Sequence, residues 1–131
     1  MIVIDASAMI EFLLQTPLGS RVEARLVRGE PGLHAPHLMD VEVAQGLRRL
    51  VRARQVAADR AAEALADLSV FDLRRYSHVD LLLRVCALRD NFTAYDAVYV
   101  ALAEAIDAPL ITCDGPLGAT RGHAARIEVI R

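Results

Sequence analysis

Four acidic residues stand where a parallel-sheet protein places its chemistry. Asp5 and Asp114 each directly follow an apolar run that is typical of a buried strand. Glu42 and Asp96 each fall in the expected first turn of a helix. Because the ligands of open parallel sheets bind beyond the carboxyl ends of the strands, we expect these four acids to line one cleft.

Each acid also has an ordinary structural explanation. An acid in the first turn of a helix interacts favourably with the helix dipole, and an Asp directly after a strand commonly forms a turn. Asp96 is the hardest to explain in this way, because residues 97–100 are apolar or aromatic and a charge among such side chains requires a partner. The chemical argument therefore rests on the four acids as a set.

Four carboxylates that converge in one cleft repel one another, and this raises their pKa values. A divalent cation relieves the repulsion, and oxygen ligands without nearby His or Cys favour Mg²⁺ or Mn²⁺ over Zn²⁺. The four histidines are scattered, and no His or Cys spacing typical of zinc occurs. Such a site suits phosphoryl chemistry, because one bound ion can lower the pKa of a water molecule and a second can stabilise the leaving oxygen.

The elements that must position these acids follow from the apolar pattern. Strands are predicted at about 2–4, 33–35, 70–73, 110–113 and 127–130. Helices are predicted at about 8–14, 20–28, 40–54, 57–68, 78–89 and 94–106. The expected N-terminal helix caps are Ser7, Asp40 and Thr93, and Pro17 is expected to end the first helix. Loops are expected at 30–32 and 115–122. This alternation predicts an α/β fold, a five-stranded parallel sheet in the order 3-2-1-4-5 with helices on both faces.

The composition is that of a single folded domain spanning residues 1–131. The chain is 54% apolar, has no apolar run long enough to span a membrane, and lacks a charged secretory start, so we expect a cytoplasmic protein. Its net charge is −2, and all 15 basic residues are Arg. Setting the four acids aside changes the balance to +2, so local basic patches can still hold a phosphate backbone.

Several motifs together resemble the PIN-domain toxins of the VapC type over nearly the whole chain. These motifs are I-V-I-D-A-S-A, D-V-E-V-A-Q-G-L, L-R-D-N-F-T-A-Y-D-A-V-Y-V-A-L-A-E and P-L-I-T-C-D-G-P-L, of which the third contains the most specific stretch. The resemblance implies a PIN-domain-like sheet with a Mg²⁺ or Mn²⁺ site. It assigns the catalytic and metal-binding roles to Asp5, Glu42, Asp96 and Asp114, with Ser7 and Thr112 as supporting hydroxyls.

The resemblance also implies an activity and partners. It implies an endoribonuclease, the toxin of a toxin–antitoxin pair, that cleaves structured RNA such as tRNA or rRNA to arrest translation. A VapB-like antitoxin across the active-site groove and a homodimer are further implications, and the apolar residues between Val22 and Leu50 favour the homodimer. One position departs from the family, because Gln45 stands where Asn is frequent. Three candidates for RNA contacts cluster late in the helix of Glu42: Arg48, Arg49 and Arg52.

Other functional classes remain as alternatives or are excluded. A housekeeping nuclease of RNA processing and a catalytically silent PIN-like binding module are the alternatives to a toxin, and the presence of all four acids disfavours the silent module. A two-component receiver domain requires a Lys, and the chain has none. A haloacid-dehalogenase-like phosphatase requires D-x-D after the first strand, and Ser7 replaces the second Asp here.

Overall fold

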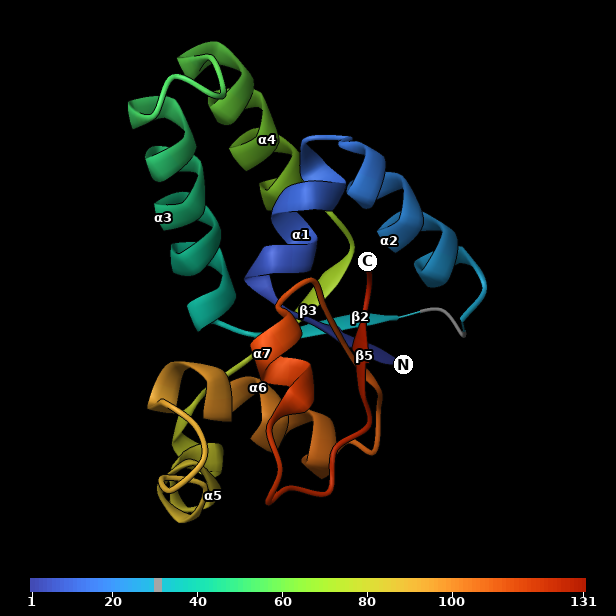
Figure 1. Cartoon of the computed structure of the whole chain (residues 1–131), viewed down its shortest axis with the longest axis vertical. Coiled ribbons are helices and arrows are strands. Elements are labelled where there is room, and N and C mark those ends of the chain that lie inside the picture. The colour runs from blue at the N-terminus through green and yellow to red at the C-terminus, as the bar shows by residue number, and fades with distance from the viewer. Residues whose placement is uncertain (30–31) are drawn as a thin grey trace.

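The computed structural model describes residues 1–29 and 32–131 and contains a five-stranded, fully parallel sheet (Figure 1). Its strand order is β3-β2-β1-β4-β5, which confirms the predicted α/β topology. Residues 30 and 31 of the predicted loop 30–32 lie outside the described residues. The strands are β1 (Ile2–Ile4), β2 (Leu33–Pro36), β3 (Leu73–Tyr76), β4 (Leu110–Thr112) and β5 (Ile127–Val129).

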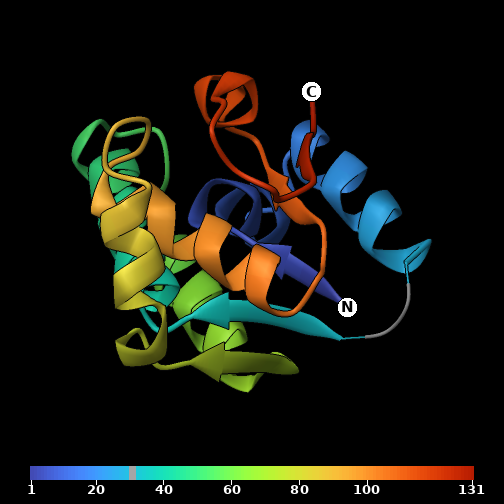
Figure 2. The ribbon, with the colours of Figure 1, turned by 90° about the horizontal axis from the view of Figure 1, so that it is seen from below.

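Helices cover both faces of the sheet (Figure 1). One layer contains α1 to α4, and the other contains α5 and α6. Figure 2 looks at the molecule from below and shows α6 crossing the strands, where it contacts β1, β2 and β4. Across the described ranges, none of the helices combines the length and the apolar character needed to cross a membrane. The helices are α1 (Ala6–Leu13), α2 (Pro17–Val27), α3 (Leu38–Arg52), α4 (Ala58–Val70), η1 (Val79–Leu81), α5 (Leu82–Ala87), α6 (Ala94–Ala105) and α7 (Gly115–Ala119).

The carboxyl ends of β1 and β4 meet at one edge of the sheet. Ile4 pairs with Ile111, and the backbone N–H of Asp5 donates to the carbonyl of Ile111 at 3.1 Å. Every residue of both strands is buried, as expected for central parallel strands covered by helices on both faces. Asp5, which follows β1, and the residue that follows Thr112 at the end of β4 therefore lie at the same edge of the sheet.

The helix α6 is apolar on all sides because it lies in the core. Its residues 97–103 are all buried. The predicted cap at Thr93 is confirmed, since its hydroxyl oxygen accepts the backbone N–H of Asp96 at 3.2 Å. Burial of its central residues thus fixes the position of α6 in the core. Asp96 lies in the first turn, at the N-terminal end of the helix.

The third strand lies at Leu73–Tyr76, so its predicted position at 70–73 is wrong. Val70 instead ends α4 and is 84% exposed. Because β3 is an edge strand paired only with β2, it tolerates Arg residues that weaken its apolar pattern. One of them, Arg75, forms an ion pair with Asp40 at 2.7 Å. Asp40 therefore lies in the first turn of α3 as an ion-pair partner and is not the predicted cap.

Two predicted helix boundaries near the N-terminus are also wrong. Pro17 begins α2 rather than ending α1, because a residue without an N–H fits the first helical turn. Thr16 is the cap of α2, and its hydroxyl accepts the N–H of Gly19 at 2.9 Å. The cap of α1 is Asp5 and not Ser7.

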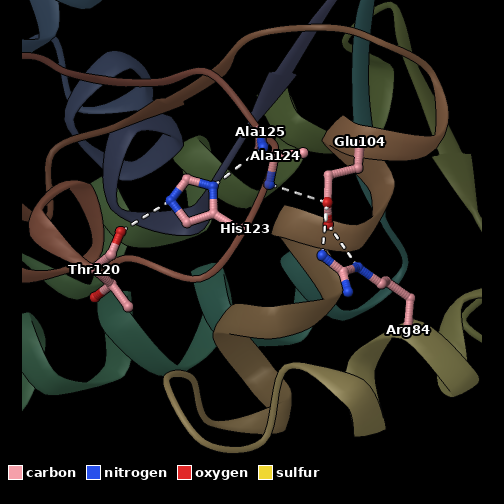
Figure 3. Close-up of polar contacts among 6 residues, drawn as sticks. All are labelled: Arg84, Glu104, Thr120, His123, Ala124 and Ala125. Carbon is pink, nitrogen blue, oxygen red and sulfur yellow. Dashed lines mark hydrogen bonds and ion pairs between the residues drawn. The ribbon is translucent and has the colours of Figure 1, made fainter.

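The segment 115–122, predicted as a loop, begins with the short helix α7, and the chain after it is fastened by hydrogen bonds (Figure 3). Nε2 of His123 donates to the backbone carbonyl of Thr120 at 2.9 Å, and Nδ1 of the same ring accepts the N–H of Ala125 at 3.1 Å. Glu104 of α6 accepts the N–H of Ala124 at 3.2 Å and pairs with Arg84 of α5 at 2.9 Å. These contacts hold the connection from α7 to β5 against α6.

Candidate active site

A pocket of about 340 Å³ contains all four predicted acids. Its walls include α1 and α3. These helices lie so close together at Gly46 that a Cβ there would be 2.3 Å from Cδ1 of Ile10. None of the four acids lines the larger pocket of about 410 Å³, which involves α1, α2 and α4 instead. The 340 Å³ pocket is lined by Asp5, Ala6, Ser7, Ile10, Glu42, Gln45, Gly46, Arg49, Asp96, Tyr99 and Asp114.

Asp5 is the most buried of the four acids, with 6% exposure. Its Oδ1 accepts the hydroxyl of Ser7 at 2.7 Å and the N–H of Ala8 at 3.0 Å, and its Oδ2 accepts the hydroxyl of Thr112. Burial raises the pKa of Asp5, and these three hydrogen bonds act in the opposite direction. The two hydroxyls predicted to support the site therefore both bind and orient Asp5.

The same hydroxyls connect Asp5 to the chain around Asp114. The hydroxyl oxygen of Ser7 accepts the N–H of Cys113 at 2.9 Å, and that of Thr112 accepts the N–H of Asp114 at 2.9 Å. These bonds fix the backbone that follows β4 relative to Asp5. Two acids that are 109 positions apart in the chain are thereby placed in one hydrogen-bonded unit.

Asp96 and Asp114 each lie at the start of a helix. Oδ1 of Asp114 accepts the N–H of Leu117 at 3.3 Å and so caps α7. Burial raises the pKa of Asp96, and the nearby charge of Asp114 raises it further. The helix-dipole explanation for Asp96 predicts a lowered pKa, whereas burial and the nearby acid together raise the pKa here.

Glu42 projects from α3 toward α6 and is half-buried. Its Oε1 accepts the hydroxyl of Tyr99 at 2.6 Å. Burial raises the pKa of Glu42, the Tyr99 bond opposes this shift, and the charges of Asp96 and Asp5 add to it. Burial and the bond to Glu42 both raise the pKa of Tyr99, so this hydroxyl stays protonated and acts as a donor.

Tyr99 is a site residue that the motif analysis did not single out. It follows Asp96 by three positions, so the two side chains lie on the same face of α6. A hydroxyl on an otherwise apolar, buried helix requires a hydrogen-bond partner, and this was the available signal. Its partner, Glu42, comes from α3 and is not identifiable from the local sequence.

The donor set of the pocket fits a hard divalent cation. All four acids supply carboxylate oxygens, and neither His nor Cys lines the pocket, which matches the preference of Mg²⁺ and Mn²⁺. Within residues 1–29 and 32–131, however, no three Asp, Glu, His or Cys side chains stand close enough together to hold one ion as placed. The carboxylates are thus near enough to shift one another's pKa, but side-chain rotation is needed before they can share an ion.

The three predicted RNA contacts separate into two groups. Arg49 lies on the same face of α3 as Glu42 and lines the acidic pocket. Arg48 and Arg52 line a different, apolar groove of about 390 Å³ between α3 and α4. In the described part of the chain, the side chain of Arg49 forms neither an ion pair nor a hydrogen bond, so its guanidinium is available to a ligand of this pocket.

The raised pKa values predict how the stability of the metal-free protein depends on pH. An acid whose pKa is higher in the folded than in the unfolded state contributes stability below its unfolded pKa, and this contribution is lost as the pH rises through the folded pKa. Asp5, Glu42 and Asp96 all belong to this class. We therefore expect the free energy of unfolding in chelator to increase as the pH falls from about 7 toward about 5.

Urea denaturation across this pH range is the measurement, with Asp96→Asn as the comparison. Glu104 and Glu128 have lowered pKa values because of their Arg partners, so their opposing loss of stability occurs at more acidic pH. The variant should show a smaller gain on acidification than the wild type. Equal pH dependence of the two proteins would show that the pKa of Asp96 is not raised in the folded state.

Residues 2–121 of the chain match the PIN domain family. The chain is 41% identical over 130 residues to Ribonuclease VapC12 of Mycobacterium tuberculosis, with 99% of each protein covered. Its fold is similar to that of PAE2754 from Pyrobaculum aerophilum, with a TM-score of 0.69, 27% identity and coverage of 98% of this chain and 83% of that one. It is also similar to a toxin–antitoxin complex from Klebsiella pneumoniae, with a TM-score of 0.64, 20% identity and 91% of each chain covered. The four-acid pocket and these likenesses agree, and the chain belongs to the PIN-domain family, among the VapC ribonucleases.

Proposed function

We propose that this protein is a metal-dependent endoribonuclease that hydrolyses phosphodiester bonds of structured RNA such as tRNA or rRNA and acts as the toxin of a toxin–antitoxin pair. The observation that carries the proposal is the convergence of Asp5, Glu42, Asp96 and Asp114 in one pocket. Burial and the charges of neighbouring acids raise the pKa values of Asp5, Glu42 and Asp96, so placing these three carboxylates together opposes folding at neutral pH. A catalytically silent binding module gains nothing that offsets this destabilisation, whereas a metal-dependent nuclease requires the carboxylates as ligands of its cation.

The four carboxylates are the groups that we assign to Mg²⁺ or Mn²⁺. When bound, the ion lowers the pKa of a water molecule and stabilises negative charge on the leaving oxygen. The protein's part is to hold its carboxylates in place. Asp5 is fixed by two hydroxyls and a backbone N–H, Asp114 by its capping bond and Glu42 by a hydroxyl of α6. Hydrolysis then adds the hydroxyl of water to phosphorus and a proton to the leaving oxygen.

We assign the contact with the RNA backbone to Arg49. A guanidinium binds a phosphate through two parallel hydrogen bonds, and Arg49 is the basic side chain among the pocket-lining residues. Its place seven residues after Glu42 puts it about two helical turns away on the same face of α3. It is thus suited to a phosphate beside the scissile one. Arg48 and Arg52, which line the apolar groove between α3 and α4, have no assigned role in RNA binding.

The test is cleavage of folded tRNA and rRNA fragments by the purified, antitoxin-free protein in Mn²⁺, with the new RNA 5′ ends mapped. We expect a few discrete cleavage sites. Arg49→Ala should raise KM about 10-fold with little change in kcat, because it removes one charge-assisted phosphate contact worth about 1.5 kcal/mol. Arg48→Ala, the neighbouring control, should change KM less than about twofold.

Three outcomes would each contradict one part of this proposal. Intact RNA after incubation with well-folded wild-type protein would reject the ribonuclease. A larger effect of Arg48→Ala than of Arg49→Ala would place the RNA in the apolar groove between α3 and α4. Broad cleavage of many RNAs without growth arrest on expression would favour the housekeeping nuclease over the toxin.

The partners belong to the proposal as well. We propose a VapB-like antitoxin that blocks the acidic pocket, and action in the cytoplasm, where the substrate RNA is found. The homodimer stays a prediction. Of the apolar residues between Val22 and Leu50, Val22, Val43 and Leu47 are buried in the chain's own core, whereas Val27 and Val41 are 77% and 67% exposed. Light scattering, compared with the chain mass of 14.3 kDa, checks the homodimer. Other exposed large apolar residues lie on η1, α5 and the start of α6: Val79, Leu82, Leu83 and Tyr95.

A further inference from the structure

The side chain that holds Glu42 comes from α6 and not from the helix of Glu42 itself. Gln45, one turn along α3, stands at the position where Asn is frequent in the family. In the structure Gln45 is exposed, and its Oε1 lies 3.5 Å from a guanidinium nitrogen of Arg48. Glu42 is instead bound by the hydroxyl of Tyr99, at 2.6 Å. The longer arm of Gln45 is therefore directed along α3 rather than at the carboxylate.

The contact between Tyr99 and Glu42 is well suited to fix a carboxylate. A distance of 2.6 Å is within the range of a strong hydrogen bond between a hydroxyl and a carboxylate ion. Tyr99 is 2% exposed, so its ring cannot move without disturbing the core. The backbone of Ala6, at the start of α1, also acts on this hydroxyl and lowers its pKa, against the larger effect of burial. Tyr99 thus links the helices that carry Asp96, Glu42 and the residue after Asp5.

The bond occupies one carboxylate oxygen and leaves the other free. Within the part of the chain that the structure describes, Oε1 of Glu42 accepts Tyr99 and no hydrogen bond reaches Oε2. No buried side-chain oxygen among these residues lacks a partner. Oε2 is therefore in contact with solvent, and because Glu42 lines the pocket, this oxygen is available to a ligand there.

We infer that Tyr99, and not Gln45, is the residue that positions Glu42 for cation binding, by holding Oε1 so that Oε2 faces the pocket. The inference rests on the proposed metal-dependent function. Asp96 and Tyr99 are one turn apart on α6, so this helix supplies both an acid of the site and the donor that orients another acid. Tyr99 is a positioning residue, since it acts through Glu42.

The test compares Tyr99→Phe with two matched controls by measuring Mn²⁺ affinity in titration calorimetry. Tyr99→Phe removes only the hydroxyl and keeps the ring that fills the core. Loss of a residue that orients a metal ligand typically weakens metal binding by about 10- to 100-fold, and we expect a weakening of at least about 10-fold. Tyr95→Phe, on the same helix and 64% exposed, and Gln45→Ala should each leave the affinity within about twofold.

A double-mutant cycle separates positioning from a general structural effect. In a Glu42→Ala background, Tyr99→Phe should weaken Mn²⁺ binding by less than about twofold, because the group through which it acts is absent. The melting temperature of each metal-free variant shows that it is folded. An unchanged Mn²⁺ affinity of Tyr99→Phe, or a loss in Gln45→Ala as large as in Tyr99→Phe, overturns the inference while the proposed function stands. Failure of the folded wild type to bind Mn²⁺ overturns both.

Discussion

Excess chelator should abolish RNA cleavage by the purified protein, and Mn²⁺ or Mg²⁺ should restore it. Four carboxylates line the pocket, and burial together with mutual repulsion raises the pKa values of three of them. Without a cation, this set offers neither a strong nucleophile nor positive charge for the leaving oxygen. We therefore expect a loss of at least about 100-fold in the cleavage rate, equivalent to about 3 kcal/mol of transition-state stabilisation.

The same metal dependence should be visible in the stability of the protein without RNA. An ion that binds only the folded state at about 100 times its Kd adds about 2.7 kcal/mol to the free energy of unfolding. Urea denaturation with and without Mn²⁺ measures this gain. The gain should be largely absent in Asp96→Asn, which lacks one of the four charges. Cleavage that continues undiminished in chelator, from a preparation shown to be free of contaminating nucleases, would contradict the metal role.

Replacing Asp96 by Asn should eliminate growth arrest while leaving the protein folded. The change is nearly isosteric, but it removes one negative charge from the proposed metal site and presents an amide donor to the cation. We expect the cleavage rate to fall by at least about 100-fold. Expression of the wild type alone should halt growth, and expression of Asp96→Asn at matched levels should not. Soluble yield and binding of the antitoxin should persist in the variant.

The stability of metal-free Asp96→Asn distinguishes a site acid from a helix-start acid. If Asp96 serves only the helix dipole, its loss costs about 0.3–1 kcal/mol and toxicity is retained. Its raised pKa predicts the reverse, because the folded protein gains when this charge is removed at neutral pH. Asp90→Asn is the control, since Asp90 is exposed and does not line the pocket. A folded Asp96→Asn that still arrests growth would decide for the helix-start explanation.

Much of the architecture could be predicted from the sequence, because it follows from local patterns. The runs that form β1 and β4 are apolar apart from the buried Thr112, as expected for strands covered on both faces. The all-round apolar character of α6 predicted its burial, and Thr93 marked its start. The pattern failed where burial is one-sided: β3 is an edge strand whose Arg residues pair with neighbours, and its residues did not stand out as a strand.

The four acids were identifiable from the sequence because each stands at the end of a strand or the start of a helix, and a parallel topology carries such positions to one edge. Side-chain partnerships were not identifiable in this way. Tyr99 meets Glu42 across 57 positions, and Arg49 lines the pocket while its neighbour Arg48 lines another groove. These partnerships depend on the rotation of α3 and α6 about their axes and on the close approach that Gly46 permits. Helix packing fixes the rotation and the approach, so the contacts of the site were decided only by the tertiary structure.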